Sequence, residues 1–134
     1  IHIFIDLCAT GTKQERNDKI NRLIQGVYSI AMFMIESGIP QAYIWYDKVN
    51  GVIQEYSVEQ EEELYWMFQE LFRSKTTTEE SELMEAYVDW GKGRLLESAL
   101  YLTVADHESL DSGNLVRDRL EVMDLRGDVI EDQE

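Results

Sequence analysis

The sequence contains a single cysteine, Cys8, and therefore no Cys-x-x-Cys pair. One thiol cannot form a disulfide within its own chain, and no cluster of cysteine and histidine has the spacing of a structural zinc site. The sequence thus excludes a disulfide-stapled scaffold and favours a reducing compartment.

Long apolar runs are also lacking. No run approaches the roughly 20 residues needed to cross a bilayer, and no basic segment precedes Ile1 as it would in a signal peptide. We therefore expect no membrane insertion by this segment. The chain starts inside an apolar run without an initiator methionine, so we interpret residues 1–134 as a single domain from a longer protein. We expect a cytoplasmic location, with any membrane tether in segments outside this chain.

Basic residues are scarce. Lys and Arg number 12 against 27 Asp and Glu, which gives a formal net charge of -15. Such a charge repels nucleic-acid phosphates and anionic lipid, so we expect no binding of nucleic acid. Cations, basic peptides and basic protein surfaces are the natural partners. The simpler explanation of the charge is solubility.

Apolar periodicity and turn signals predict alternating strands and helices. We expect strands at 1–6, 42–46, 52–56, 98–105 and 120–125, and helices at 13–37, 58–73, 79–90 and 114–119. Asn50-Gly51 is a strong hairpin signal, so the third strand returns antiparallel to the second. The order predicts an α/β fold: a doubly wound, mostly parallel sheet with helices on both faces and one antiparallel edge strand.

Helix starts and core faces follow from the same pattern. Capping boxes are expected at Thr12 with Glu15 and at Ser57 with Gln60. In the second helix the stripe expected to face the core consists of Leu64, Met67, Phe68, Leu71 and Phe72. The tryptophans also fall on expected core faces, and they are Trp45, Trp66 and Trp90.

Two of the expected strands are followed by an aspartate, Asp6 and Asp106. The carboxyl ends of parallel strands share one edge of the sheet, where open α/β sheets bind their ligands, so both carboxylates are expected there. The loop after Asp6 adds Cys8 and Thr10 at alternate positions. Neither a base nor an electropositive setting is visible for Cys8, so we interpret it as a small, half-buried thiol and not a nucleophile.

These features together resemble a known family. The strand ending in Asp6 with its D-x-C-x-T loop, the long helix, the hairpin, the threonines at 76–78 and the later strand ending in Asp106 resemble the von Willebrand factor A domain. More narrowly, Glu15 at the helix start, the run 39–46 and the order of elements resemble the bacterial A-like family catalogued as domain of unknown function number fifty-eight. The resemblance covers most of the chain.

The resemblance implies a metal-ion-dependent adhesion site for Mg²⁺ or Mn²⁺, which these families build from D-x-S-x-S, a threonine and a later aspartate. The matching residues here are Asp6, Thr10, one of Thr76, Thr77 and Thr78 (Thr77 is our choice), and Asp106. Cys8 departs from this pattern, because it stands where a serine hydroxyl should contact the ion and a thiol is a poor ligand for Mg²⁺. The implied site is therefore degenerate.

For function, the resemblance implies a non-enzymatic protein-interaction module that works with a MoxR-type AAA+ ATPase in protein assembly or maturation. An alternative is a phosphohydrolase of the haloacid-dehalogenase type, whose D-x-D-x-T motif would use Asp6 as the nucleophile. Asp6 and Thr10 match that motif. Cys8 replaces its general acid, and a long helix follows where those enzymes place a small hairpin flap.

Overall fold

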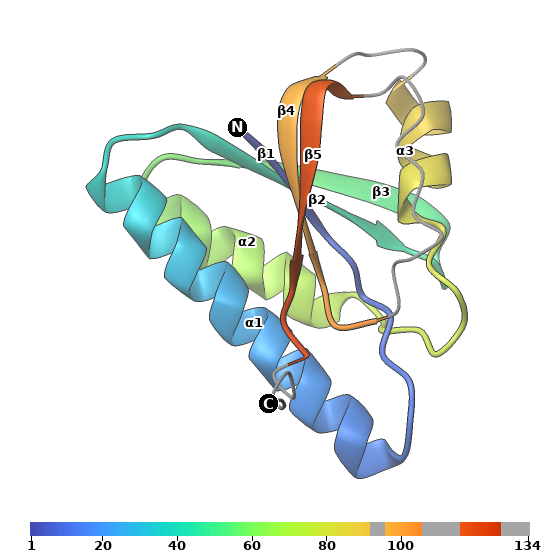
Figure 1. Ribbon diagram of the computed structural model, residues 1–134. Coiled ribbons are helices and arrows are strands. Elements are labelled where there is room, and N and C mark those ends of the chain that lie inside the picture. The colour runs from blue at the N-terminus through green and yellow to red at the C-terminus, as the bar shows by residue number, and fades with distance from the viewer. Residues whose placement is uncertain (92–95, 106–115, 127–134) are drawn as a thin grey trace, which may run out of the picture.

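The computed structural model describes residues 1–91, 96–105 and 116–126. Its strands are β1 (His2–Ile5), β2 (Gln41–Asp47), β3 (Val52–Val58), β4 (Leu96–Thr103) and β5 (Val116–Asp124), and its helices are α1 (Lys13–Glu36), α2 (Glu61–Arg73) and α3 (Leu83–Gly91). They form one five-stranded sheet in the order β3-β2-β1-β4-β5 (Figure 1). β1 runs parallel to β2 and β4, β4 runs parallel to β5, and β3 is antiparallel to β2. The predicted α/β fold with one antiparallel edge strand is confirmed at this level.

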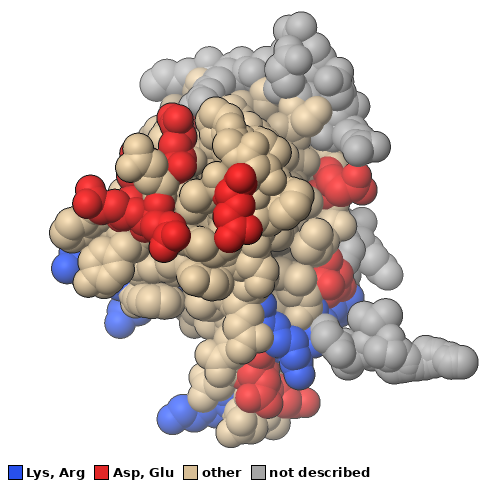
Figure 2. Space-filling view, turned by 90° about the vertical axis from the view of Figure 1, so that its left-hand side faces the viewer, with Lys and Arg blue, Asp and Glu red and all other residues tan. Residues whose placement is uncertain are grey.

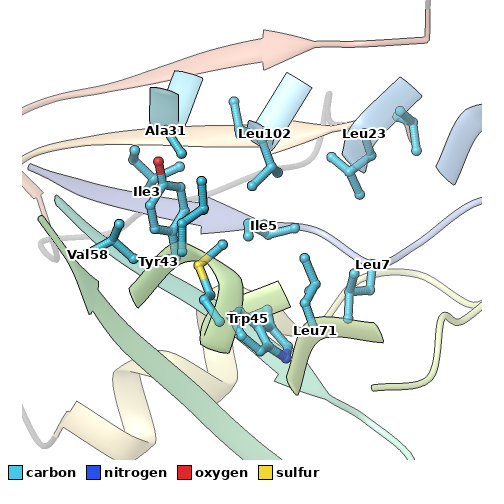
Figure 3. Packing of buried hydrophobic residues seen from close by; sticks show 14 of the residues in the cluster. Ile3, Ile5, Leu7, Leu23, Ala31, Tyr43, Trp45, Val58, Leu71 and Leu102 are labelled. Carbon is cyan, nitrogen blue, oxygen red and sulfur yellow. The ribbon is translucent and has the colours of Figure 1, made fainter. Parts of the chain in front are cut away.

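Helices cover both faces of the sheet, because successive side chains of a strand point to opposite sides. Ile3 and Ile5 of β1 pack with α1 and α2 in the larger core cluster. Phe4, between them, packs with α3 and lies edge-on to the ring of Tyr87 at 5.1 Å. Figure 3 shows the larger cluster, with Trp45 of β2 lying beside Leu71 of α2.

α1 begins at a capping box and buries a narrow stripe. The Thr12 hydroxyl accepts from the Glu15 amide at 3.2 Å, and the Glu15 carboxylate accepts from the Thr12 amide at 2.7 Å, as predicted. Leu23 and Val27 lie against the sheet with no exposed surface. Between them, Gly26 allows a close approach, since a Cβ there would lie 2.5 Å from a methyl carbon of Leu125.

The predicted start of the second helix was wrong. Ser57 and Val58 continue β3 and pair with Ala42 and Gln41, because strand pairing supplies partners for their backbone groups. α2 therefore begins at Glu61.

The helix predicted at 114–119 was also wrong in its described part. Residues 116–119 belong to β5, where they extend the parallel pairing with β4; residues 114 and 115 lie outside the described residues. α3 starts at Leu83, later than predicted. The Glu79 carbonyl accepts from the Cys8 thiol and the Leu83 amide donates to the Ser81 hydroxyl, so these backbone groups are bonded outside a helix.

Aromatic residues depart most from the expected core. Trp45 is fully buried, but Trp66 is 59% exposed, Trp90 46% and Phe72 64%. α2 contacts the sheet through Leu64, Met67 and Leu71, a stripe on one side of the helix. Trp66 and Phe72 lie off that stripe, so the outer surface of α2 is rich in apolar groups.

None of the helices within the described residues is both long and apolar enough to cross a bilayer.

Replacing Leu23 by alanine tests the α1 packing. Leu23 is fully buried, so Leu23→Ala is expected to lower the free energy of unfolding by about 2–5 kcal/mol through lost burial and the cavity left behind. Urea denaturation followed by circular dichroism measures this change. Phe33→Ala on the same helix is the control, because Phe33 is 62% exposed, and it is expected to change stability by less than about 0.5 kcal/mol. Equal effects of the two substitutions would contradict the packing described.

Candidate functional site

Asp6 lies directly after β1, at the edge of the sheet where the sequence predicts a site, and is only 3% exposed. Its Oδ2 accepts a hydrogen bond from the Thr103 hydroxyl at 2.9 Å, and its Oδ1 accepts from the Cys8 amide at 3.2 Å. The Thr103 hydroxyl in turn accepts from the Ala105 amide at 3.0 Å. Both oxygens of the carboxylate are therefore engaged by the protein itself.

Burial raises the pKa of Asp6 above its ordinary value, because the charged carboxylate loses its hydration. Hydrogen bonds from Thr103, Ser81, the Cys8 amide and Tyr101 oppose this rise without cancelling it. The hydrogen bonds thus fix the position of the Asp6 side chain, whereas its burial favours the protonated carboxyl group over the carboxylate.

The thiol of Cys8 is buried and donates a hydrogen bond to the Glu79 carbonyl at 2.9 Å. Burial, with a further contribution from the charge of Asp6, raises the pKa of Cys8 to about 11. The group is accordingly a neutral thiol near pH 7. This agrees with the structural role predicted for it and disfavours nucleophilic chemistry.

Thr77 is brought beside this loop by its main chain. Its amide donates to the Leu7 carbonyl, and its carbonyl accepts from the Ala9 amide, both at 2.9 Å. The Thr77 hydroxyl accepts from the Glu79 amide at 3.1 Å. The segment before α3 is therefore fixed against the end of β1.

The other predicted site residues are not gathered in the same way. Thr76 and Thr78 are exposed. Thr10 is exposed as well, and it does not line a small pocket that lies beside Asp6 and is described below. The Thr10 carbonyl accepts a hydrogen bond from the Lys19 ammonium at 3.0 Å. Asp106 lies outside the described residues. The structure thus brings together Asp6, Cys8 and Thr77.

Three residues of this edge were missed by the sequence reasoning: Thr103, Ser81 and Lys48. Thr103 was detectable as the one threonine in the strand predicted just before Asp106. Lys48 follows the end of β2, the parallel neighbour of β1, and its ammonium lies 2.9 Å from Glu79 and 3.5 Å from Glu82. The pocket that Lys48 and Ser81 line with Asp6 has a volume of about 10 Å³, close to the space of one water molecule.

Among the described residues, the donor groups of this edge are a poor match for Mg²⁺ or Mn²⁺. These ions favour oxygen ligands, and Mg²⁺ requires a near-octahedral set. The described lining offers the Asp6 carboxylate, whose oxygens already accept hydrogen bonds, and the engaged Thr77 hydroxyl. The Glu82 carboxylate also lines the pocket but lies 3.5 Å from the Lys48 ammonium, and the Cys8 thiol beside Asp6 is protonated. The Lys48 ammonium also lines the pocket, and its positive charge opposes a cation there.

A second candidate site is a groove of about 820 Å³ between α1 and α2, on the side of the helices away from the sheet core. It is lined by Ile24, Gln25, Tyr28, Ser29, Met32, Glu61, Leu64, Tyr65, Phe68, Gln69 and Phe72. The ring of Phe68 lies 6.4 Å from Tyr28 and 5.5 Å from Phe72, so the aromatic groups form a continuous wall. Sequence reasoning missed this site by assigning Phe72 to the core.

Fold and sites together define a mixed α/β domain with a closed polar edge and an open apolar groove. Comparisons with protein-family models, with curated proteins and with solved structures find no match.

The raised pKa of Asp6 gives a pH-dependent prediction. The folded state holds this proton more tightly than the unfolded chain, so ionisation of Asp6 lowers the free energy of unfolding as pH rises from about 4 through the raised pKa. Asp6→Asn removes that contribution. The difference in unfolding free energy, variant minus wild type, is expected to increase over this range by ~1.4 kcal/mol per unit of pKa difference. Urea denaturation at several pH values measures it, and a difference that is constant or falls with pH would contradict the assignment.

Burial of Cys8 predicts a slow thiol reaction. The native chain is expected to react with a disulfide reagent at pH 8 at least about tenfold more slowly than the urea-unfolded chain, since the thiol is covered and protonated. Absorbance of the released thiolate follows the reaction. The control is a Cys8→Ala, Thr78→Cys chain, whose exposed cysteine should react rapidly when folded. Comparable rates for both folded chains would show that Cys8 is accessible.

Proposed function

We propose that this chain is a non-enzymatic protein-interaction module that docks its partner in the groove between α1 and α2. The observation that carries the proposal is the contrast between the two candidate sites, about 820 Å³ at the groove and about 10 Å³ at Asp6. A partner side chain can enter the first and not the second. Of these two sites, the groove is therefore the one with capacity for binding a partner.

The chemistry of the groove supports a protein partner. Tyr28, Tyr65 and Phe72 are large side chains that remain exposed along it. Clustered exposed aromatic groups mark interaction sites more often than ordinary surface, and aromatic anchors dominate the binding energy of many interfaces. Glu61 is the one charged residue in the lining, so a partner can desolvate most of the groove without burying charge.

The phosphohydrolase alternative has less support. A nucleophilic carboxylate must reach its substrate, whereas Asp6 is nearly covered and both of its oxygens accept hydrogen bonds from the protein. A phosphate ester does not fit a pocket of about 10 Å³. Cys8, which stands at the position of the general acid, donates a hydrogen bond to the Glu79 carbonyl. These features favour a structural role for Asp6.

We propose a MoxR-type AAA+ ATPase as the class of partner, on the basis of the resemblance to A-like domains. In our proposal the module binds such a partner through α1 and α2, and the degenerate adhesion motif serves to fix the loop after β1. Docking then requires no ion.

Affinity capture tests the proposed function. The tagged full chain, incubated with lysate of the organism that encodes it, is expected to retain a specific protein, with the AAA+ ATPase as the expected identity. The Phe72→Ser chain should retain at least about tenfold less of that protein than the wild-type chain, because the substitution removes an aromatic anchor. Quantitative mass spectrometry measures the retained amounts.

The matched control is Phe33→Ser. Phe33 has nearly the same exposure as Phe72, 62% against 64%, but lies outside the groove lining, so this variant should retain the partner. Equal retention by all three chains would contradict docking in the groove. Turnover of a phosphate ester above that of an Asp6→Asn chain would contradict the non-enzymatic assignment.

A further inference from the structure

We infer that the occupant of the α1–α2 groove is an amphipathic helix of the partner, with an apolar stripe and Lys or Arg side chains toward the end that faces the start of α2. This inference rests on the proposed function and specifies the partner chemistry of the same groove.

The walls of the groove favour a helix over an extended peptide. α1 and α2 lie side by side and run in opposite directions in Figure 1. The backbone groups of both helices are satisfied within the helices, so the groove presents side chains and no free edge for strand addition. From Glu61 to Phe72 its α2 wall spans about 16 Å at the usual helical rise. This length matches about three turns of a third helix packed against two others.

Charge at one end of the groove selects a basic partner. Glu61 lines the groove and Glu62 follows it at the start of α2. Glu36, four residues after the lining residue Met32, falls on the same face of α1. Within the described ranges no Lys or Arg forms an ion pair with any of these three carboxylates. At the other end, Arg73 is paired with Glu70 at 2.8 Å.

The view in Figure 2 shows the same polarity on one side of the molecule. Most of the acidic side chains in this view lie in its upper half and the basic ones lie in its lower half, where some of them lie next to acidic side chains; a broad uncharged area occupies the middle of the view. A helix with basic groups at one end can therefore match the distribution of charge on this side.

Three other occupants are less well matched. A second copy of the chain, or an anionic lipid surface, would meet a net charge of -15 with charge of the same sign. A small apolar molecule would fit the volume of the groove, but it would leave the carboxylates at the start of α2 without a role. The basic helix uses both features.

Binding of designed peptides to the full chain tests the inference. The first probe is a fluorescein-labelled helical peptide of about 16 residues, with Leu at every third or fourth position and Lys beside the stripe toward one end. In the second probe Glu replaces each Lys, and in the third Ser replaces each Leu. Fluorescence anisotropy measures the dissociation constants at low and high salt.

The Lys probe is expected to bind the wild-type chain at least about tenfold more tightly than either other probe. Phe72→Ser should weaken it by about tenfold or more, and Phe33→Ser should leave it unchanged. Glu61→Lys with Glu62→Lys should weaken it by about fivefold or more and reduce its salt dependence. The matched charge control, Glu85→Lys with Asp89→Lys on α3, should have less effect, since α3 covers the opposite face of the sheet.

Failure of the inference can be separated from failure of the proposed function. Equal binding of the Lys and Glu probes, both lost in Phe72→Ser, would overturn the basic partner while leaving docking in the groove intact. Tight binding of the Lys probe that is unaffected by Phe72→Ser would overturn the groove itself. Self-association of the chain that Phe72→Ser abolishes, or binding of an apolar dye that none of the peptides displaces, would assign the groove to another occupant and overturn the inference.

Discussion

Parallel pairing of β1 on both sides is the constraint on which the rest of the structure depends. β1 is the middle strand of five, so the residue that follows it enters the interior of the fold. That residue is Asp6, a carboxylate that must then find partners inside the protein. Thr103, at the end of the neighbouring strand, and the Cys8 amide supply them. The bond to Thr103 joins positions that are 97 residues apart, and the Thr77 bridge holds the segment before α3 against the same loop.

This arrangement closes the edge of the sheet that commonly binds ligands in α/β proteins. Protein groups occupy the hydrogen-bonding positions of Asp6 and Cys8, and only a small volume is left among them. The opposite is true of the outer side of α1 and α2, where these helices use one stripe each for the core and leave aromatic side chains uncovered. A fold of this kind can keep its polar edge as a structural element and use its helical surface for recognition.

The sequence predicted those features that depend on local chemistry. The Thr12 capping box, the Asn50-Gly51 hairpin and the alternation of strands and helices each reflect short-range preferences, and the structure contains them. Features set by tertiary pairing were not predictable in this way. The strand predicted at 120–125 belongs to β5, but the extension of β5 back to Val116 depends on the parallel edge that β4 offers. The hydrogen bond between Thr103 and Asp6 likewise needs both of their strands in place. Phe72 was misassigned because aromatic residues surround α2 on several sides, so apolarity alone could not show which side meets the sheet.

Mapping the residues that bind the peptide is the most direct test of docking in the groove between α1 and α2. Amide chemical shifts of the isotopically labelled full chain, recorded with and without the Lys-flanked helical peptide, report which residues change environment on binding. The account predicts that the largest shifts fall at residues 24–32 and 61–72, while the amides of 6–9 and 77–82 stay nearly constant. Largest shifts at 6–9 and 77–82, with the two helices unaffected, would contradict it and return the binding function to the edge of the sheet at Asp6.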